Sequence, residues 1–169
     1  DLLSMLAEAY PDLQPRFVEE QTQHLITRLR NGNLDLAIMA LPSEATGMVD
    51  SPLYTEKFSI VCPPDHPIAG REDVELAELK DLDLLLLDDG HCLRDQVVDL
   101  CRHANINPAE ATNSVTRASS LTTIMQLVMG GLGCTLVPES ALATECHGKD
   151  VAVAHFAPDV TAEREVGLV

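Results

Sequence analysis

The stretch Leu84-Leu85-Leu86-Leu87-Asp88-Asp89-Gly90-His91-Cys92-Leu93-Arg94-Asp95-Gln96 decides how the fold is interpreted. Four consecutive leucines indicate a strand that is buried on both faces. A polar turn follows, and residues 93–103 then have the apolar spacing of a helix. A strand, turn and helix in this order are typical of an α/β protein, in which ligands bind at the carboxyl ends of the strands.

The same alternation of helix and strand patterns runs along the rest of the chain, and it predicts an α/β fold with a largely parallel sheet. Pro11 should end the first helix, and Gly32 should stop the second. The further helices are expected at residues 2–9, 22–30 and 121–129, and the further strands at 16–19, 34–41, around 115, 134–137 and 166–169.

Breaks in the pattern near residues 51–56 and 157–163 predict two lobes. Residues 1–55, with 163–169 returning to them, would form lobe I, and residues 56–162 would form lobe II. The chain begins within a helical pattern and ends on a strand pattern, so we expect a fragment that lacks a first strand and a last helix.

Composition limits the class of function. The 169 residues carry a formal charge of −16, which argues against direct binding of this stretch to nucleic acid or to an anionic membrane. An apolar content of 46% with 22% charged residues is that of a folded protein. The odd number of cysteines, five, with no apparent signal peptide or membrane span, favours a reducing, cytoplasmic location, and the alternative is an exported chain whose signal peptide has been removed.

Cys92 is the first candidate for chemistry. It falls at the start of the predicted helix, where free backbone N–H groups and the helix dipole favour a thiolate. His91 and Arg94 add positive character, whereas the nearby aspartates oppose it. The alternative, with equal weight on spacing alone, is that Cys92 is simply a small residue in a polar turn.

Cys101 lies nine positions further along the same predicted helix. Nine residues rise roughly 13–14 Å, whereas a disulfide requires Cα atoms within about 4.4–6.8 Å. A bond between Cys92 and Cys101 would therefore require the helix to unwind. On spacing alone we favour the simpler alternative, in which Cys101 is a small buried residue beside Val97, Val98 and Leu100.

Two further interpretations of the cysteines carry less weight. His91, Cys92, Cys101 and His103 supply ligand types for zinc, but a helix holds them too far apart to converge on one ion. No metal or other cofactor is therefore expected. The remaining cysteines are interpreted as structural: Cys62, Cys134 and Cys146.

The segment Asp89–Gln96, with Cys101 after it, resembles the peroxide-sensing branch of the LysR-type transcriptional regulators. Nearly the whole chain is similar to the effector domain of that family, which implies a two-lobe fold like that of the periplasmic binding proteins. The other stretches that carry the resemblance are Glu20-Gln21-Thr22, Gly32-Asn33-Leu34-Asp35-Leu36-Ala37-Ile38, Asp65-His66-Pro67 and Gly131-Leu132-Gly133-Cys134-Thr135-Leu136-Val137-Pro138.

The resemblance implies a role for each thiol. Cys92 would be the sensing thiolate that hydrogen peroxide oxidises to sulfenic acid. Cys101 would resolve it to an intramolecular disulfide, with local unfolding of the helix.

The resemblance also implies a peroxide-binding set around these thiols. Thr22 would hydrogen-bond the peroxide or a water, although plain helix capping is an equal alternative. His91 and Arg94 would polarise the oxygens beside Gly90, and Asp95 would orient Arg94. Each of these has the alternative role of a solvated turn residue.

The family further implies partners outside this stretch. The domain would form a homodimer or homotetramer, and DNA would be bound only through a helix-turn-helix domain that the chain lacks. RNA polymerase and thiol reductants would be the other partners, with no membrane. The chain would not be an enzyme. Two alternatives stay open: a LysR-type domain that binds a small organic effector without redox chemistry, and a thiol enzyme that uses His91 and Cys92.

Overall fold

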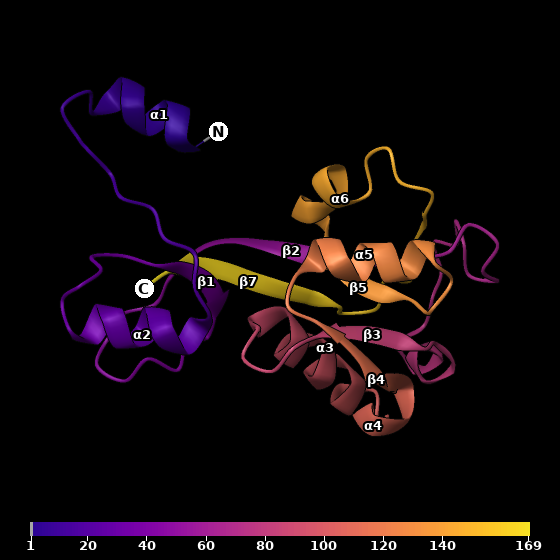
Figure 1. The fold of residues 1–169 in the computed structure, drawn as a ribbon. Coiled ribbons are helices and arrows are strands. Elements are labelled where there is room, and N and C mark those ends of the chain that lie inside the picture. Colours follow the sequence, from indigo (N-terminus) through magenta and orange to yellow (C-terminus); the bar gives the residue numbers. More distant parts are fainter. Residues whose placement is uncertain (1) are drawn as a thin grey trace.

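The computed structural model describes residues 2–169, and for residues 2, 110 and 112–117 the description is limited to the backbone. Helices and strands are mixed along the chain, although successive helices or strands interrupt the predicted alternation at several points (Figure 1). The elements in chain order are α1 (Leu2–Ala9), α2 (Thr22–Arg30), β1 (Ile38–Leu41), β2 (Ser51–Cys62), the 3-10 helix η1 (Leu76–Asp81), β3 (Leu84–Leu87), α3 (Cys92–His103), α4 (Pro108–Ala111), β4 (Thr112–Ala118), α5 (Leu121–Met129), β5 (Thr135–Pro138), α6 (Glu139–Glu145), β6 (Ala152–His155) and β7 (Glu163–Leu168).

The α/β fold class is confirmed, but the prediction of a largely parallel sheet is wrong. The five-stranded sheet has the order β1-β7-β2-β5, with β6 also paired to β2, and all its strand pairs are antiparallel. An apolar run reports burial on both faces of a strand but not its direction, which depends on where the connection re-enters the sheet.

Parallel pairing occurs outside the five-stranded sheet, in the two-stranded sheet next to α3 and in isolated bridges such as that of Val74 with Phe156. Strand β3 pairs with β4 in parallel, and Leu84 forms a parallel bridge with Cys134. The four leucines are all buried, as the apolar run predicts. Their strand thus lies between β4 and the segment that leads into β5.

The long strand β2 runs through one of the two predicted lobe boundaries. Residues 51–57 of β2 pair with β7, and residues 58–62 pair with β5 and β6. The region of residues 51–56 is therefore continuous strand and not a break in secondary structure. In Figure 1, β2 and β7 extend side by side from α2 to the larger half of the molecule. The division into two lobes stays a prediction.

The two faces of the sheet are covered by different helices. Phe58, Ile60 and Cys62 of β2 pack into one core cluster with the buried residues of α3. Val61 points to the other face and packs with Ile124 of α5 and with the partly buried side of α6. Figure 1 shows α3 and α4 on one side of this sheet, with α5 and α6 on the other.

A third, smaller core cluster lies at the other end of β2. It joins Ile26 of α2 to Met39 of β1 and to Val169. The helix α1 stands away from this cluster and is joined to α2 by an extended segment (Figure 1). The strand that the sequence predicts at residues 16–19 is wrong, because this segment has no strand partner.

Helix bounds follow the sequence signals closely. The predicted helices at 22–30 and 121–129 are α2 and α5, and the latter is capped by Ser120, whose Oγ accepts a hydrogen bond from the Thr123 backbone N–H at 3.2 Å. Among the described residues, no helix is both long and apolar enough to span a bilayer.

Candidate functional site

The turn between β3 and α3 is held by backbone geometry. The Asp88 N–H donates to the Ala118 carbonyl at 2.9 Å, which fixes the end of β3 against β4. Gly90 has a φ of +90°, which side chains other than hydrogen rarely allow. His91 is the N-cap residue, so α3 begins at Cys92.

Cys92 thus occupies the position that the sequence predicts for a reactive thiol. It is the first residue of a twelve-residue helix, is half-buried and carries a free thiol. Its neighbour His91 is also half-buried and makes no side-chain cap hydrogen bond to the helix. The first turn of α3 therefore presents its dipole and its backbone N–H groups next to the half-buried Cys92.

Arg94 lies in the first turn of α3 and forms ion pairs with two carboxylates. Its Nη2 is 2.8 Å from Asp89 Oδ1, and its Nη1 is 3.5 Å from Asp95 Oδ1. Asp95 lies where an orienting partner is expected, but Asp89 makes the shorter contact. Both carboxylates are mostly exposed, so the pairs fix the direction of the guanidinium more than they stabilise the fold.

Two polar atoms in this turn of helix are buried and have no hydrogen-bond partner among the described residues. They are Arg94 Nε and Gln96 Oε1. One is a donor and the other an acceptor, so both could serve a small polar ligand or a water. The sequence does not single out Gln96.

Cys101 lies in a different environment from Cys92, although both belong to α3. It is fully buried, in the core cluster that contains Val97 and Leu100. Burial raises the pKa of its thiol. Cys101 is therefore a small core residue in this reduced structure, as the simpler interpretation predicts, while its place in the helix keeps it about 13–14 Å along the axis from Cys92.

Thr22 and Gly90 belong to distant parts of the sequence whose elements meet in the fold. A Cβ added at Gly90 would lie 3.1 Å from Gln21 Oε1, so the start of α2 reaches the turn before α3. Thr22 is half-buried and is the first residue of α2. Capping as its role is wrong, because Gln21 is the N-cap residue and the cap has no side-chain hydrogen bond.

The site therefore gathers the predicted residues of the β3–α3 turn and brings the start of α2 next to them. Gly90, His91, Cys92, Arg94 and Asp95 all lie in the turn and the first turn of α3, and Cys101 lies in the core near the other end of the same helix. Sequence reasoning missed the contributions of Asp89 and Gln21. Both are in stretches quoted for the resemblance, but their contacts depend on tertiary approach.

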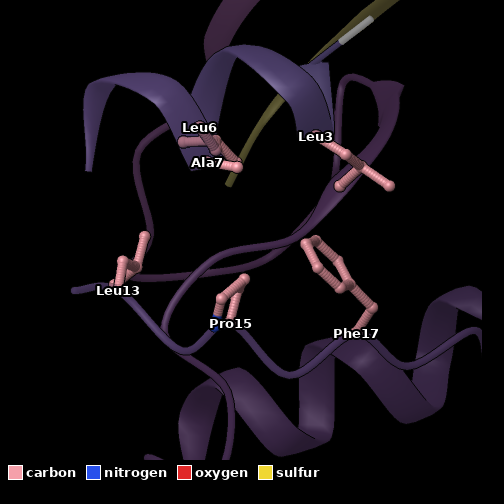
Figure 2. A pocket seen from close by; sticks show the side chains of 6 residues that line it. All are labelled: Leu3, Leu6, Ala7, Leu13, Pro15 and Phe17. Carbon is pink, nitrogen blue, oxygen red and sulfur yellow. The ribbon is translucent and has the colours of Figure 1, made fainter. Parts of the chain in front are cut away.

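Two hollows of the surface lie away from these thiols. One, of about 130 Å³, lies between α1 and the segment after it and is lined by apolar side chains from Leu3 to Phe17 (Figure 2). Another, of about 180 Å³, lies beside Lys57, Glu139 and His155. Neither includes Cys92 or Cys101. Within residues 2–169 as described, three or more His, Cys, Asp or Glu side chains do not converge on a metal position.

Comparison with known proteins gives relatives along the whole chain. It is 46% identical over 168 residues to a probable hydrogen peroxide-inducible genes activator of Mycobacterium avium, covering 99% of this chain and 53% of the relative. It is 38% identical over 170 residues to the DNA-binding transcriptional dual regulator OxyR of Escherichia coli K12, with the same coverage. The chain thus spans about half the length of the curated relatives it matches.

Solved structures agree with this. A cysteine-to-serine mutant of Corynebacterium glutamicum OxyR with hydrogen peroxide bound is 60% identical, with a TM-score of 0.95 over 99% of this chain and 52% of that one. The oxidised form of the same protein is 62% identical, with a TM-score of 0.84 over 99% and 51% of the two chains. The family described as the LysR substrate binding domain matches residues 1–169. This chain therefore belongs to the LysR substrate-binding domain family and has the fold of the OxyR regulatory domains.

Proposed function

We propose that this chain is the hydrogen-peroxide-sensing regulatory domain of a LysR-type transcriptional regulator. The observation that carries the proposal is the placement of two free thiols in one helix, an accessible one at its first residue and a buried one nine positions later. Relatives named as hydrogen peroxide-inducible activators support the choice of signal.

The first chemical step takes place at Cys92. Its thiolate attacks one oxygen of hydrogen peroxide, the O–O bond breaks, and sulfenic acid and hydroxide form. The helix start, His91 and Arg94 stabilise the thiolate and the departing oxygen, and Asp95 with Asp89 holds the guanidinium in place. Thr22 approaches from α2 and hydrogen-bonds the peroxide.

The second step joins the two sulfurs. The Cys101 thiol attacks the sulfenic sulfur, a disulfide forms, and water leaves. Because the helix separates the two residues by more than a disulfide allows, α3 unwinds between them. Oxidation is in this way converted into a change of shape.

The change of shape then reaches the rest of the regulator. Oxidation alters how two or four copies of this domain assemble, and with that the spacing of helix-turn-helix domains on DNA. RNA polymerase recognises the altered complex on DNA. Thiol reductants then reduce the disulfide and return Cys92 and Cys101 to free thiols. The name of the Escherichia coli relative, a DNA-binding transcriptional dual regulator, supports this output.

One equivalent of hydrogen peroxide should produce a Cys92–Cys101 disulfide. Non-reducing digestion and mass spectrometry would detect the linked peptides. The Cys101→Ala variant should stop at the sulfenic acid, which a dimedone adduct on Cys92 would report, and Cys146→Ala should behave like the parent. A parent protein whose α3 thiols both stay reduced would overturn the proposal.

A second candidate function is the binding of a small organic effector, which the match to a substrate-binding domain family favours. In that case Cys92→Ser would keep the response of the protein to its effector. Under the redox proposal, Cys92→Ser loses the response to peroxide.

A further inference from the structure

Two cysteines outside α3 lie opposite each other in the sheet. The antiparallel register of β2 and β5 pairs Phe58 with Pro138 and continues stepwise to Val61 with Thr135. One more step in the same register would place Cys62 opposite Cys134, which immediately precedes β5. Both thiols are free, and both residues are buried, at 0% and 1% exposure.

The backbone shows which kind of antiparallel pair this is. The Phe58 N–H donates to the Ala162 carbonyl, so it points away from β5, and by alternation the backbone of Cys62 does the same. The Cys134 N–H donates to the Asp83 carbonyl at 2.9 Å, and its carbonyl accepts from the Leu85 N–H at 2.7 Å, so both point away from β2. Cys62 and Cys134 therefore form a non-hydrogen-bonded pair.

Pairs of this kind bring side chains close together. Their Cα atoms lie about 4.5 Å apart, within the range of about 4.4–6.8 Å that disulfides require. Residues directly opposite each other also share one face of the sheet. The neighbouring pair of Ile60 and Leu136 packs in the same core cluster as the two cysteines, which confirms that both thiols point to the face covered by α3.

We propose that Cys62 and Cys134 are a second redox couple, able to close to an intramolecular disulfide independently of Cys92 and Cys101. The couple differs from the α3 pair in one respect that follows from geometry. Its two residues are already adjacent in the folded state, so the finished disulfide fits the fold with every helix and strand intact. It would cross-link the end of β2 to the residue just before β5 and enclose η1, β3, α3, α4, β4 and α5 within one covalent loop.

The oxidant is a small organic disulfide such as oxidised glutathione. The thiolate of one cysteine attacks a sulfur of the glutathione disulfide, and one glutathione leaves as its thiolate. The second cysteine then loses its proton and attacks the protein sulfur of the mixed disulfide, and the second glutathione leaves. Two protein thiols are oxidised while one glutathione disulfide is reduced to two thiols.

Burial makes this exchange slow. Burial raises the pKa of Cys134 to about 12, with Cys62 and Asp83 adding to the effect, and it also raises the pKa of Cys62. The Cys62 thiol in addition donates a weak hydrogen bond to the Ala152 carbonyl at 3.7 Å. Cys62 and Cys134 should therefore react only while β2 and β5 are transiently separated. During brief exposure to the oxidant, both thiols should stay reduced.

The test uses the full protein with Cys92→Ser and Cys101→Ser, so that the α3 thiols cannot react. The protein is held with oxidised glutathione in sub-denaturing urea, returned to buffer and alkylated with iodoacetamide. Trypsin alone leaves Cys134 and Cys146 in one peptide, so digestion must include a glutamyl endopeptidase, which cuts after Glu139. The expected product is a peptide with Cys62 linked to one with Cys134.

Controls separate this pair from accidental oxidation. A Cys146→Ala change in the same background should keep the link, and Cys134→Ala should abolish it. The oxidised protein should have an unchanged circular dichroism spectrum and a higher urea midpoint than its reduced form. Alkylation of both Cys62 and Cys134, a link through Cys146, or a lower midpoint after oxidation would each overturn the proposal.

Discussion

Gly90 is the residue on which the shape of the β3–α3 turn depends. Its φ of +90° is disfavoured for other residues, and its missing side chain leaves room for Gln21, whose amide would lie 3.1–3.4 Å from a Cβ. The lack of a Cβ at Gly90 therefore permits both the conformation of the turn and the close approach of the start of α2.

Gly90→Ala should lower the free energy of unfolding by roughly 1–2 kcal/mol from backbone strain, with an added cost from displaced Gln21. Urea denaturation would measure this loss. Gly148→Ala is the matched control, because Gly148 also has a positive φ, +69°, but no atom within 4 Å of the added Cβ. Adding Gln21→Ala to Gly90→Ala should recover part of the lost stability, whereas adding it to Gly148→Ala should not. Equal losses in Gly90→Ala and Gly148→Ala would contradict the contact between Gly90 and Gln21.

At this scale, sequence reasoning located Cys92 at a helix start and Cys101 in the core. Both follow from local signals, a polar turn before an apolar helix face. The ion pair of Arg94 with Asp89 and the approach of Gln21 to Gly90 could not be predicted, because each depends on how the turn folds back or on which distant element meets it.

The helix α3 is the element that must change if the proposed switch operates. It contains two trypsin sites, Arg94 and Arg102, and an exposed pair between Arg102 Nη1 and Asp99 Oδ1 at 2.9 Å adds little to its stability. Its buried side chains, Val97, Val98, Leu100 and Cys101, attach it to the core.

Peroxide treatment should lower the far-ultraviolet helical signal and speed tryptic cleavage at Arg94 and Arg102 by about tenfold or more, because cleavage follows the open population of a segment. Time-resolved digestion would measure both sites, with Lys80 in η1 as the internal reference. The Cys101→Ala variant should show no acceleration. Equal digestion rates before and after oxidation of the parent would rule out local unwinding.

Elements with strong local signals were predicted well, and elements defined by pairing were not. Helix α2 begins and ends where its apolar face and Gly32 indicate. The expected strand at residues 16–19 lacks a partner, and strand direction in the main sheet was wrong because only the tertiary connections determine it. The segments of α6 and β6 are short, at seven and four residues, and too weakly periodic to be predicted as a helix and a strand.

A buried carboxylate links three elements of the molecule, β2, β7 and α6. Glu56, almost fully buried, accepts hydrogen bonds from Arg164 Nε at 2.8 Å and from the Ser140 backbone N–H at 3.1 Å. Burial by itself would raise the pKa of Glu56, but the hydrogen bonds from Ser140 and Arg164 outweigh it and hold the pKa below its usual value.

Glu56→Gln should therefore cost roughly 1.5–3 kcal/mol of stability at neutral pH, as expected for hydrogen bonds to a charged group. Because the folded pKa is lowered, this contribution is complete above the ordinary value of about 4.3 and is lost as the pH falls through the folded pKa. Urea denaturation of parent and variant from neutral to acidic pH should show the two converging in acid. A difference that does not shrink in acid would contradict the role of the carboxylate.

The charge of −16 acts on the molecule as a whole. Self-repulsion destabilises a compact acidic chain, and added salt screens it. The melting temperature of this chain should rise by roughly a few degrees between about 0.01 and 0.15 M NaCl, where the Debye length falls from about 30 to 8 Å. Differential scanning fluorimetry would measure this rise in melting temperature. The Glu8→Gln variant, which removes one exposed charge, should show a slightly smaller rise. A melting temperature that falls with salt would contradict the argument.

The twelve residues of β2, about 40 Å of extended chain, pass from the cluster around α2 to the cluster around α3 in one piece, with β7 hydrogen-bonded alongside over half that length. Because this ribbon is continuous, the two core clusters are joined by strand hydrogen bonds and not by a flexible loop. The main chain that leads from one cluster to the other is therefore itself part of the sheet.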